Sequence, residues 1–221
     1  MSRRPAARTA GPVRTEQILH AARALFAERG FERTAMADIA DRLGLSEPAI
    51  YKHFAGKREL LLKVLDGWYE EMYAEYAVAL AGTRGTRDRL RLLVARHLHS
   101  VKDNPKLCRL MFREVRAEED YPGSGLHAQN RRYTQLLVEV LKEGVAAGEL
   151  RASLPLTLLR DMIYGGIEHH TWGYVASAAR GPAGGRVGLD ADALADDIVE
   201  VLWRGASAPA VRVELRAGAR K

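Results

Sequence analysis

The chain has 221 residues, 47% of them hydrophobic, so it can bury one sizeable core and a smaller domain. Its net charge of +6 is uneven, because residues 1–60 hold eleven Lys and Arg against seven Asp and Glu. The single cysteine, Cys108, excludes a disulfide framework, and no apolar run approaches the length of a membrane span or a signal peptide. We therefore expect a cytoplasmic protein with no membrane partner.

The N-terminal segment divides into an arm and a helix. Residues 1–13 contain Pro, Gly, Ala and three arginines without periodicity, which predicts a disordered basic arm. Residues 14–29 have apolar residues at helical spacing, and Gly30 is placed to end that helix. This helix should pack across the two short helices that follow.

Residues 34–54 predict two short helices joined by a sharp turn. Thr34 is expected to be the N-cap of the first helix, and Gly44 lies where the chain must leave that helix with a positive φ. The buried face of the first helix is expected to contain Met36, Ile39, Ala40 and Leu43.

The second of these helices has few inward anchors. Ser46 is its expected N-cap, Pro48 lies in its first turn, and only Ile50 and Phe54 point inward. An ordinary solvated helix is the alternative interpretation, but the caps, the turn glycine and the apolar spacing agree with one another. The outward surface fits the B-DNA major groove, about 12 Å wide. It consists of Glu47, Ala49, Tyr51, Lys52 and His53.

These residues carry a family resemblance. The sequence RTEQILHAARALFAERGFERTAMADIADRLGLSEPAIYKHFAGKRELL, over about residues 14–62, resembles the TetR/AcrR family of bacterial transcriptional regulators. It has the G-x-S turn, the Y-x-H-F end of the recognition helix and the K-x-x-L that opens a long fourth helix. The pair Glu47 and Pro48 departs from the small residues that often follow the turn serine. The expected DNA contacts are Thr34, Ser46, Glu47, Pro48, Ala49, Tyr51, Lys52, His53 and Lys57.

Residues 57–80 predict the long fourth helix, which ends at the break between Gly82 and Gly85. Its first residue, Lys57, should hold a phosphate oxygen together with the first free N–H groups. Because this helix belongs to both parts of the molecule, we expect a DNA-binding domain over residues 14–60 and a ligand-binding and dimerisation domain over residues 61–205.

The remaining sequence is helical again, without strand alternation. The expected segments are residues 86–102, 105–115, a long helix ending at Gly148, an apolar helix after Pro155 and a last helix from Asp190 to Gly205. The fold class is therefore all-α, with about nine helices, and residues 206–221 form a disordered basic tail.

The last two helices carry more apolar surface than one copy can bury. This surplus predicts a homodimer in which two copies form a four-helix bundle. The expected interface residues are Leu159, Ile163, Leu194, Ile198, Val201 and Leu202.

The apolar and aromatic residues of the C-terminal half predict a site for a small hydrophobic effector. The expected lining is His97, Met111, Phe112, Tyr133, Met162, Tyr164, His169 and Trp172. The segments MFREVRAEEDY, KEGVAAGEL and YGGIEHHTW are similar to TetR-type regulators of fatty-acid metabolism that bind acyl-CoA thioesters. A drug-like effector is an alternative, and so is a C-terminal domain that acts only as a protein-interaction module.

An enzyme is not expected. His169 and His170 are neighbours about 100° apart on a helix, so they are badly placed to share one metal ion. The sequence also has no phosphate-binding loop and no nucleophile elbow. We expect no catalytic residue, no metal and no cofactor. The resemblance implies a repressor that binds a palindromic double-stranded DNA operator, at the nucleoid, until an effector releases it.

Overall fold

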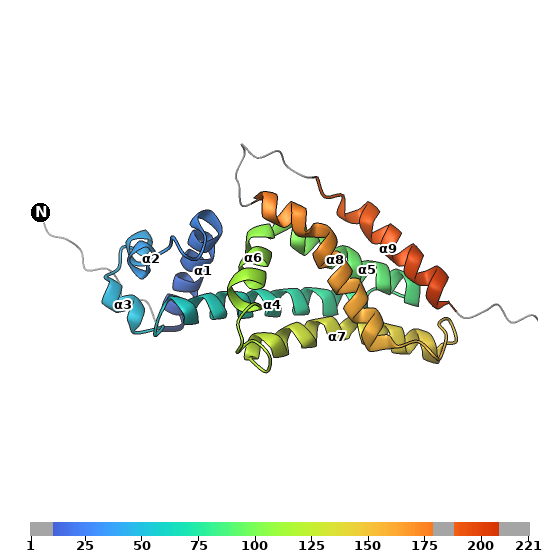
Figure 1. Cartoon of the computed structure of the whole chain (residues 1–221). Coiled ribbons are helices and arrows are strands. Elements are labelled where there is room, and N and C mark those ends of the chain that lie inside the picture. Colours follow the sequence, from blue (N-terminus) through green and yellow to red (C-terminus); the bar gives the residue numbers. More distant parts are fainter. Residues whose placement is uncertain (1–10, 179–187, 208–221) are drawn as a thin grey trace, which may run out of the picture.

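The computed structural model describes residues 11–178 and 188–207, which form an all-α fold (Figure 1). Outside the helices these residues contain one isolated β-bridge, between Leu150 and Ser207. The helices are α1 (Gly11–Arg29), α2 (Met36–Leu43), α3 (Glu47–Tyr51), α4 (Lys57–Ala81), α5 (Thr86–Asp103), α6 (Pro105–Leu110), the π-helical turn η1 (Met111–Val115), α7 (Gly125–Ala146), α8 (Leu156–Ala178) and α9 (Ala191–Ala206). The predicted fold class is confirmed.

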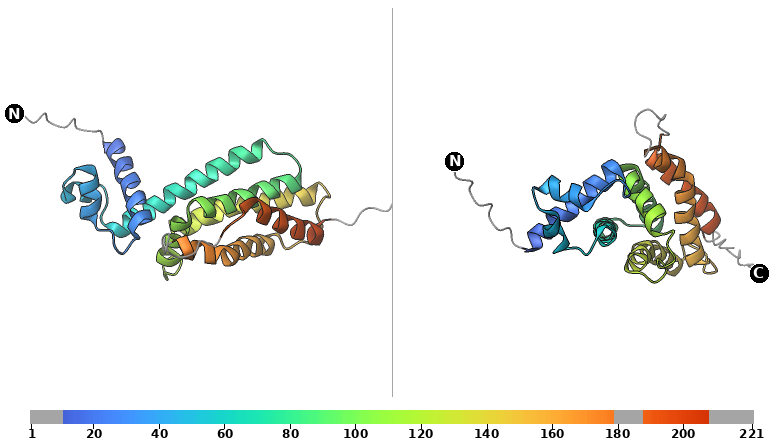
Figure 2. Two further views of the ribbon diagram at one scale, coloured as in Figure 1. Left: turned by 90° about the horizontal axis from the view of Figure 1, so that it is seen from above. Right: turned by 60° about the vertical axis from the view of Figure 1, so that its left-hand side comes forward.

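Two groups of helices share α4. An N-terminal unit, α1–α3, lies at one end of the molecule, and a C-terminal bundle, α5–α9, lies at the other (Figures 1 and 2). Helix α4 packs against α1 in the first group and against α5 and α7 in the second. A rigid helix of this kind can carry a tilt from one group to the other.

The N-terminal unit has a small apolar core. The helices α1, α2 and α3 each contribute fully buried residues to it: Ile18, Ala22, Leu25, Phe26, Ile39 and Ile50. Gly44 ends α2 with φ 63°, a left-handed conformation that glycine adopts without steric cost. The N–H of Leu45 then donates to the carbonyl oxygen of Ala40 at 2.9 Å, and the chain enters α3.

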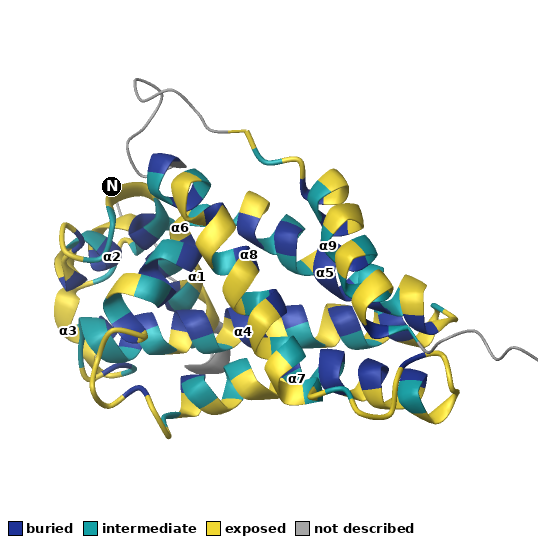
Figure 3. Cartoon of the chain, turned by 45° about the vertical axis from the view of Figure 1, so that its right-hand side comes forward, coloured by how far each residue is buried: buried dark blue, intermediate teal, exposed yellow. Residues whose placement is uncertain are grey.

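In the C-terminal bundle α5 is central, because it packs against α4, α7, α8 and α9. Buried faces run along these helices, while their outer faces are exposed (Figure 3). The tightest approach is at Gly144 of α7, where an added Cβ would lie 2.5 Å from Cγ2 of Thr86. Only glycine fits there, so this position fixes how α7 meets the start of α5.

Several predicted boundaries need correction. Helix α1 begins at Gly11, so residues 11–13 are helical and do not belong to the arm. Helix α7 ends at Ala146, before the predicted Gly148, and Gly205 lies within α9. Residues 1–10, the glycine-rich segment 179–187 and residues 208–221 lie outside the described residues.

Candidate DNA interface and effector site

Helix α3 presents the surface that was expected to meet DNA. Ile50 and Phe54 are buried and hold the helix against α1 and α2. The side chains that face outward are Ser46, Glu47, Pro48, Tyr51 and Lys52, with Ala49 and His53 half-buried beside them. A short helix attached by one edge leaves the opposite edge free for a groove of DNA.

Thr34 does not belong to this surface. Thr34 is only 1% exposed, and its hydroxyl donates to the carbonyl oxygen of Gly30 at 2.8 Å. The predicted N-cap role is also wrong, since Ala35 is the N-cap of α2 and Asp38 accepts a hydrogen bond from the Ala35 N–H at 2.7 Å. Thr34 therefore holds the α1–α2 turn together from inside.

Lys57 starts α4 as predicted, but its ammonium group points into the protein. The Nζ atom donates to the carbonyl oxygen of Phe31 at 3.0 Å and lies 4.4 Å from the centre of the Phe31 ring. Both contacts anchor the start of α4 to the α1–α2 turn. The expected phosphate contact of the Lys57 side chain is therefore revised, whereas Lys52 is exposed and free to make one.

An aromatic cluster occupies the middle of the C-terminal bundle. Tyr133 of α7 is at its centre, and its hydroxyl is hydrogen-bonded to Nδ1 of His97. The ring centre of Tyr133 lies 5.4 Å from that of Tyr164 and 5.8 Å from that of Tyr76. Tyr69 completes the cluster, with its ring centre 5.9 Å from that of Tyr133.

The polar atoms of this cluster are neutral and incompletely paired. The hydroxyls of Tyr76 and Tyr164 are buried and have no hydrogen-bond partner among the described residues. Burial raises the pKa of Tyr76, Tyr133 and Tyr164 well above the ordinary value. Desolvation also lowers the pKa of His97 to about 4. At neutral pH the cluster therefore offers hydrogen-bonding groups without charge.

The eight predicted effector residues fall into separate groups. His97, Tyr133 and Tyr164 meet in the cluster just described. Phe112 pairs instead with Trp172, their ring centres being 6.3 Å apart. The other three are Met111, which is buried, and Met162 and His169, which are exposed.

Two features were missed by the sequence prediction. Tyr69 and Tyr76 of α4 join the cluster, whereas α4 was predicted only to link the two parts of the molecule. The spacing of seven residues between the two tyrosines was the available signal. Arg58 of α4 donates to the backbone carbonyl of Glu114 in η1. A π-helical turn is uncommon and frequently marks a functional position. The contact therefore joins the start of α4 to an irregular turn of the bundle.

A large apolar groove lies between α8 and α9. It has a volume of about 600 Å³, and all six predicted interface residues line it, namely Leu159, Ile163, Leu194, Ile198, Val201 and Leu202. Met162 and Val201 are among the most exposed large apolar residues, at 62% and 75%. A surface of this kind is typical of one that a partner covers.

Over residues 11–178 and 188–207, no group of three or more His, Cys, Asp or Glu side chains is placed to hold a metal ion. Within the same ranges, no helix is both long and apolar enough to cross a bilayer.

Comparison with known families decides the classification. Residues 18–64 match the family described as bacterial regulatory proteins, tetR family, and residues 83–173 match the tetracyclin repressor-like C-terminal domain. The chain belongs to the TetR family. It is a DNA-binding transcriptional regulator, as the sequence predicted.

Individual relatives agree with this assignment. The chain is 29% identical over 168 residues to the HTH-type transcriptional repressor KstR2 of Mycobacterium tuberculosis, covering 75% of this chain and 82% of that protein. It is 36% identical over 108 residues to the HTH-type transcriptional activator FasR of Mycolicibacterium smegmatis, covering 49% and 47% respectively. The fold also resembles FadR from Bacillus subtilis, solved in complex with stearoyl-CoA, with a TM-score of 0.73, 22% identity and coverage of 86% and 98%.

Proposed function

We propose that this TetR-family chain is a homodimeric repressor that leaves a palindromic operator when a small hydrophobic effector binds its C-terminal bundle. The observation that carries the effector proposal is the aromatic cluster, in which the buried hydroxyls of Tyr76 and Tyr164 have no hydrogen-bond partner within the part of the chain that the structure describes. An unpaired buried hydroxyl costs about 1–3 kcal/mol, so a ligand that pairs with it is favoured.

The roles of the DNA-facing residues follow from their positions on α3. Glu47 and Ala49, near the start of the helix, are proposed to face base edges and to set operator preference. Lys52 and His53, at its end, are proposed to contact phosphates; His53 is steadied by a 3.0 Å hydrogen bond between its Nδ1 atom and the Thr15 hydroxyl.

The dimer is supported by the groove between α8 and α9. Both helices are attached to the rest of the bundle on one side, and the opposing faces leave an apolar hollow. Two helices from a second copy would fill it and form a four-helix bundle. The dimer would place two α3 helices about one turn of DNA apart, roughly 34 Å, as a palindrome requires.

The chemistry of the cluster narrows the effector. A charged group would have to lose its hydration among neutral tyrosines and a neutral His97, which is costly. A long apolar molecule with a neutral carbonyl brings no charge into the cluster, and its carbonyl oxygen can accept a hydrogen bond from an unpaired tyrosine hydroxyl. A fatty acyl thioester has this chemistry, and the likeness in fold to the FadR structure with stearoyl-CoA is consistent with it.

Release requires a path from the cluster to α3. Arg116, which follows η1, forms a 2.5 Å ion pair with Glu168 of α8, and Arg58 of α4 hydrogen-bonds to η1 itself. An effector that prefers a shifted α8 would thereby move η1 and tilt α4. A tenfold loss of operator affinity needs only about 1.4 kcal/mol of such coupling.

The experiment that tests the function has two stages. Selection of bound sequences from random double-stranded DNA should yield a palindrome with half-sites about one helical turn apart. Palmitoyl-CoA should then raise the melting temperature of the protein, whereas decane-1-sulfonate, which is charged and has no carbonyl, should not. If no compound in a broad hydrophobic panel shifts the melting temperature, the C-terminal bundle is a protein-interaction module instead.

A further inference from the structure

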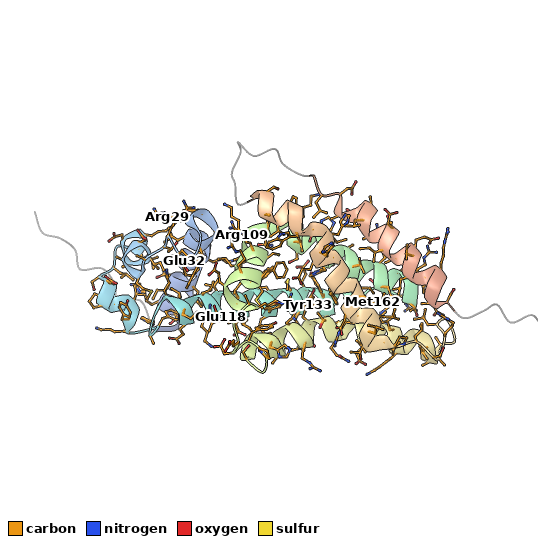
Figure 4. The ribbon with its side chains drawn as sticks, viewed as in Figure 1. Arg29, Glu32, Arg109, Glu118, Tyr133 and Met162 are labelled. Carbon is orange, nitrogen blue, oxygen red and sulfur yellow. The ribbon has the colours of Figure 1, made fainter. Side chains whose placement is uncertain are left out.

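A hydrogen bond joins the beginning of α1 to the segment that follows α3. The Thr15 hydroxyl lies 3.0 Å from Nδ1 of His53, a residue 38 positions later in the chain. Arg29, at the other end of α1, forms an ion pair with Asp38 of α2 and lies away from α3 (Figure 4). The beginning of α1 is therefore the part that reaches the surface proposed to meet DNA.

The place of Thr15 follows from the apolar stripe of α1. Ile18 and Ala22, three and seven residues further on, are fully buried in the core of the N-terminal unit. This spacing puts Thr15 on the same face of the helix, one turn before the buried stripe begins. Thr15 is half-buried there. Its short polar side chain thus lies at the edge of the core, within reach of His53.

The backbone around His53 is held by other contacts. The His53 N–H donates to the carbonyl oxygen of Ile50 at 2.9 Å, and the next residue, Phe54, is buried in the core. These contacts leave the two side-chain torsions of His53 undetermined. The hydrogen bond to Thr15 restrains them, so the imidazole ring is presented in one orientation, whereas Lys52 beside it is exposed.

The same bond decides which ring nitrogen can donate to DNA. Because Nδ1 of His53 is bonded to the hydroxyl, a phosphate oxygen would have to bind at Nε2, on the other side of the ring. A phosphate oxygen accepts hydrogen bonds, so Nε2 must carry a proton. When the Thr15 hydroxyl donates to Nδ1, the neutral ring carries its proton on Nε2. When the ring carries both protons, the hydroxyl oxygen accepts from Nδ1–H and Nε2–H is retained.

We propose that Thr15 is a positioning residue for DNA binding, whose hydroxyl holds the His53 ring so that Nε2–H faces a phosphate oxygen of the bound duplex. A hydroxyl suits this role because it can donate one hydrogen bond and accept two. A carboxylate could only accept, which would place the proton of the neutral ring on Nδ1 and leave Nε2 without one. The inference rests on the proposed function in one respect, namely the phosphate contact of His53.

This arrangement gives α1 an indirect part in DNA binding. Helix α1 packs against α4 as well as α2. A tilt of α4 that moves the beginning of α1 would therefore move the Thr15 hydroxyl, turn the His53 ring and weaken its phosphate contact. Thr15 itself need not contact DNA for this effect.

The test measures DNA affinity of the full chain by fluorescence anisotropy, on the selected operator and on a random duplex of the same length. Thr15→Val, which keeps the branched shape and removes the hydroxyl, should bind both about three- to tenfold more weakly, the effect of losing one hydrogen bond. The loss should be equal on the two duplexes because phosphates carry no sequence information. Thr15→Ser, which keeps the hydroxyl, should bind as the parent does.

Two further measurements separate positioning from a general effect on the fold. In a His53→Ala background, Thr15→Val should cause no additional loss of affinity, because its effect passes through His53. Long-range ¹H–¹⁵N spectra should show the His53 proton on Nε2 in the parent and in Thr15→Ser, and a mixture of tautomers in Thr15→Val. Thr83→Val is the matched control, since it removes a hydroxyl that donates to the Ala79 carbonyl at 2.9 Å beyond the far end of α4. It should leave DNA affinity unchanged.

Several results would overturn the inference. They are unchanged DNA affinity in Thr15→Val, an equal loss in the His53→Ala background, binding of Thr15→Ser as weak as that of Thr15→Val, or a His53 proton on Nδ1 in the parent. If His53→Ala weakens binding and Thr15→Val does not, the inference fails and the proposed phosphate contact stands. If His53→Ala binds as tightly as the parent, both fail. A selection that yields no palindrome would reject the proposed operator alone, because the random duplex still reports on Thr15.

Discussion

The N-terminal unit and the C-terminal bundle differ in how completely their polar groups are paired. In α1–α3 and the turns between them, buried polar side chains have partners, as the Thr34 hydroxyl does at the Gly30 carbonyl. All four buried side-chain atoms without a partner among the described residues lie in α4 or later, on Tyr76, Arg89, Tyr121 and Tyr164. The apolar groove between α8 and α9 belongs to the same half.

This difference indicates two kinds of part. In the N-terminal unit the buried polar side chains are paired within one copy, and the surface expected to meet DNA is formed without a second copy. The C-terminal bundle has unpaired buried hydroxyls and an uncovered apolar groove, which a ligand and a second copy would pair and cover. Natural proteins tolerate unpaired buried groups mainly where function requires them. If the bundle is incomplete in this sense and the N-terminal unit is not, substitutions in the two parts should have different effects.

The largest effect is expected where the bundle lacks a partner. Val201→Glu puts a charge into the groove between α8 and α9, so the protein should become monomeric. Operator affinity should fall at least about 100-fold, because a monomer reads one half-site, and this corresponds to about 2.7 kcal/mol. Sedimentation velocity and operator titration measure the two effects.

Val78→Glu is the matched control for that variant. Val78 and Val201 are both 75% exposed valines on helices, but Val78 does not line the groove. Val78→Glu should leave the dimer and the operator affinity unchanged. Equal behaviour of the two variants would mean that the groove is an ordinary surface.

A second effect tests a part of the bundle that is fully packed. Gly144→Ala should destabilise the protein by about 2–3 kcal/mol, because its Cβ would meet Thr86 and Leu150 at 2.5 and 2.9 Å. Gly67→Ala, in an exposed position of α4 with open space around it, should instead stabilise it by about 0.5–1 kcal/mol. Urea unfolding gives both values, and a tolerated Gly144→Ala would refute the close approach of α7 to α5.

The next prediction concerns the neutral centre of the bundle. The pKa of His97 is about 4 in the folded chain, whereas an unfolded histidine titrates near 6.5. Between about pH 4 and pH 6.5 the unfolded chain binds a proton at His97 that the folded chain does not bind. The contribution of His97 to the free energy of unfolding is therefore complete above about pH 6.5 and falls as the pH decreases. By pH 5 this group alone should remove about 2 kcal/mol.

Variants separate His97 from the other titrating groups. His97→Gln should show a shallower loss of unfolding free energy between pH 6.5 and 5 than the parent does. His20→Gln, at an exposed position of α1, should retain the parent slope. Parallel slopes for the parent and His97→Gln would show that His97 is solvated and free to ionise.

The smallest effects separate two lysines of the N-terminal unit. Lys52→Ala should reduce the slope of log operator affinity against log salt concentration by about one, which is the effect of losing one phosphate contact. Lys57→Ala should leave that slope unchanged and lower the unfolding free energy by about 1 kcal/mol, since its ammonium is bonded to the Phe31 carbonyl. If Lys57→Ala lowered the salt dependence and Lys52→Ala left it unchanged, Lys57 would be the phosphate ligand.

Local signals in the sequence were sufficient for most of the fold. The positive φ at Gly44 and the first residues of α4 and α5 are where the residue types predicted. Ser46 occupies the predicted N-cap position of α3, although its side chain makes no capping hydrogen bond. Thr34 was misassigned because its hydroxyl donates to the carbonyl oxygen of Gly30, four residues earlier, and Ala35 is the N-cap of α2 instead. Residue type alone does not show which of these two roles a threonine takes.

The effector site was harder to predict for a different reason. Helix α8 is apolar nearly all round, so periodicity does not separate the side that faces the cluster from the side that lines the groove with α9. Tyr164 proved to face the cluster, whereas Met162 is exposed beside the groove. Tyr69 and Tyr76 were not recognised as members of the cluster because α4 packs against both units. Residues are buried along most of this helix, so burial alone does not mark the part that faces the cluster.

The central claim is that an effector bound at the aromatic cluster controls operator affinity through α4. The most direct test is a titration of operator DNA with and without palmitoyl-CoA, using the parent and Tyr164→Phe, which removes one unpaired hydroxyl and keeps the ring. We predict that palmitoyl-CoA weakens operator binding at least tenfold in the parent, and that Tyr164→Phe needs several times more palmitoyl-CoA while its ligand-free operator affinity is unchanged. An identical palmitoyl-CoA response in the two proteins would contradict the account, because the effector would then bind away from the cluster.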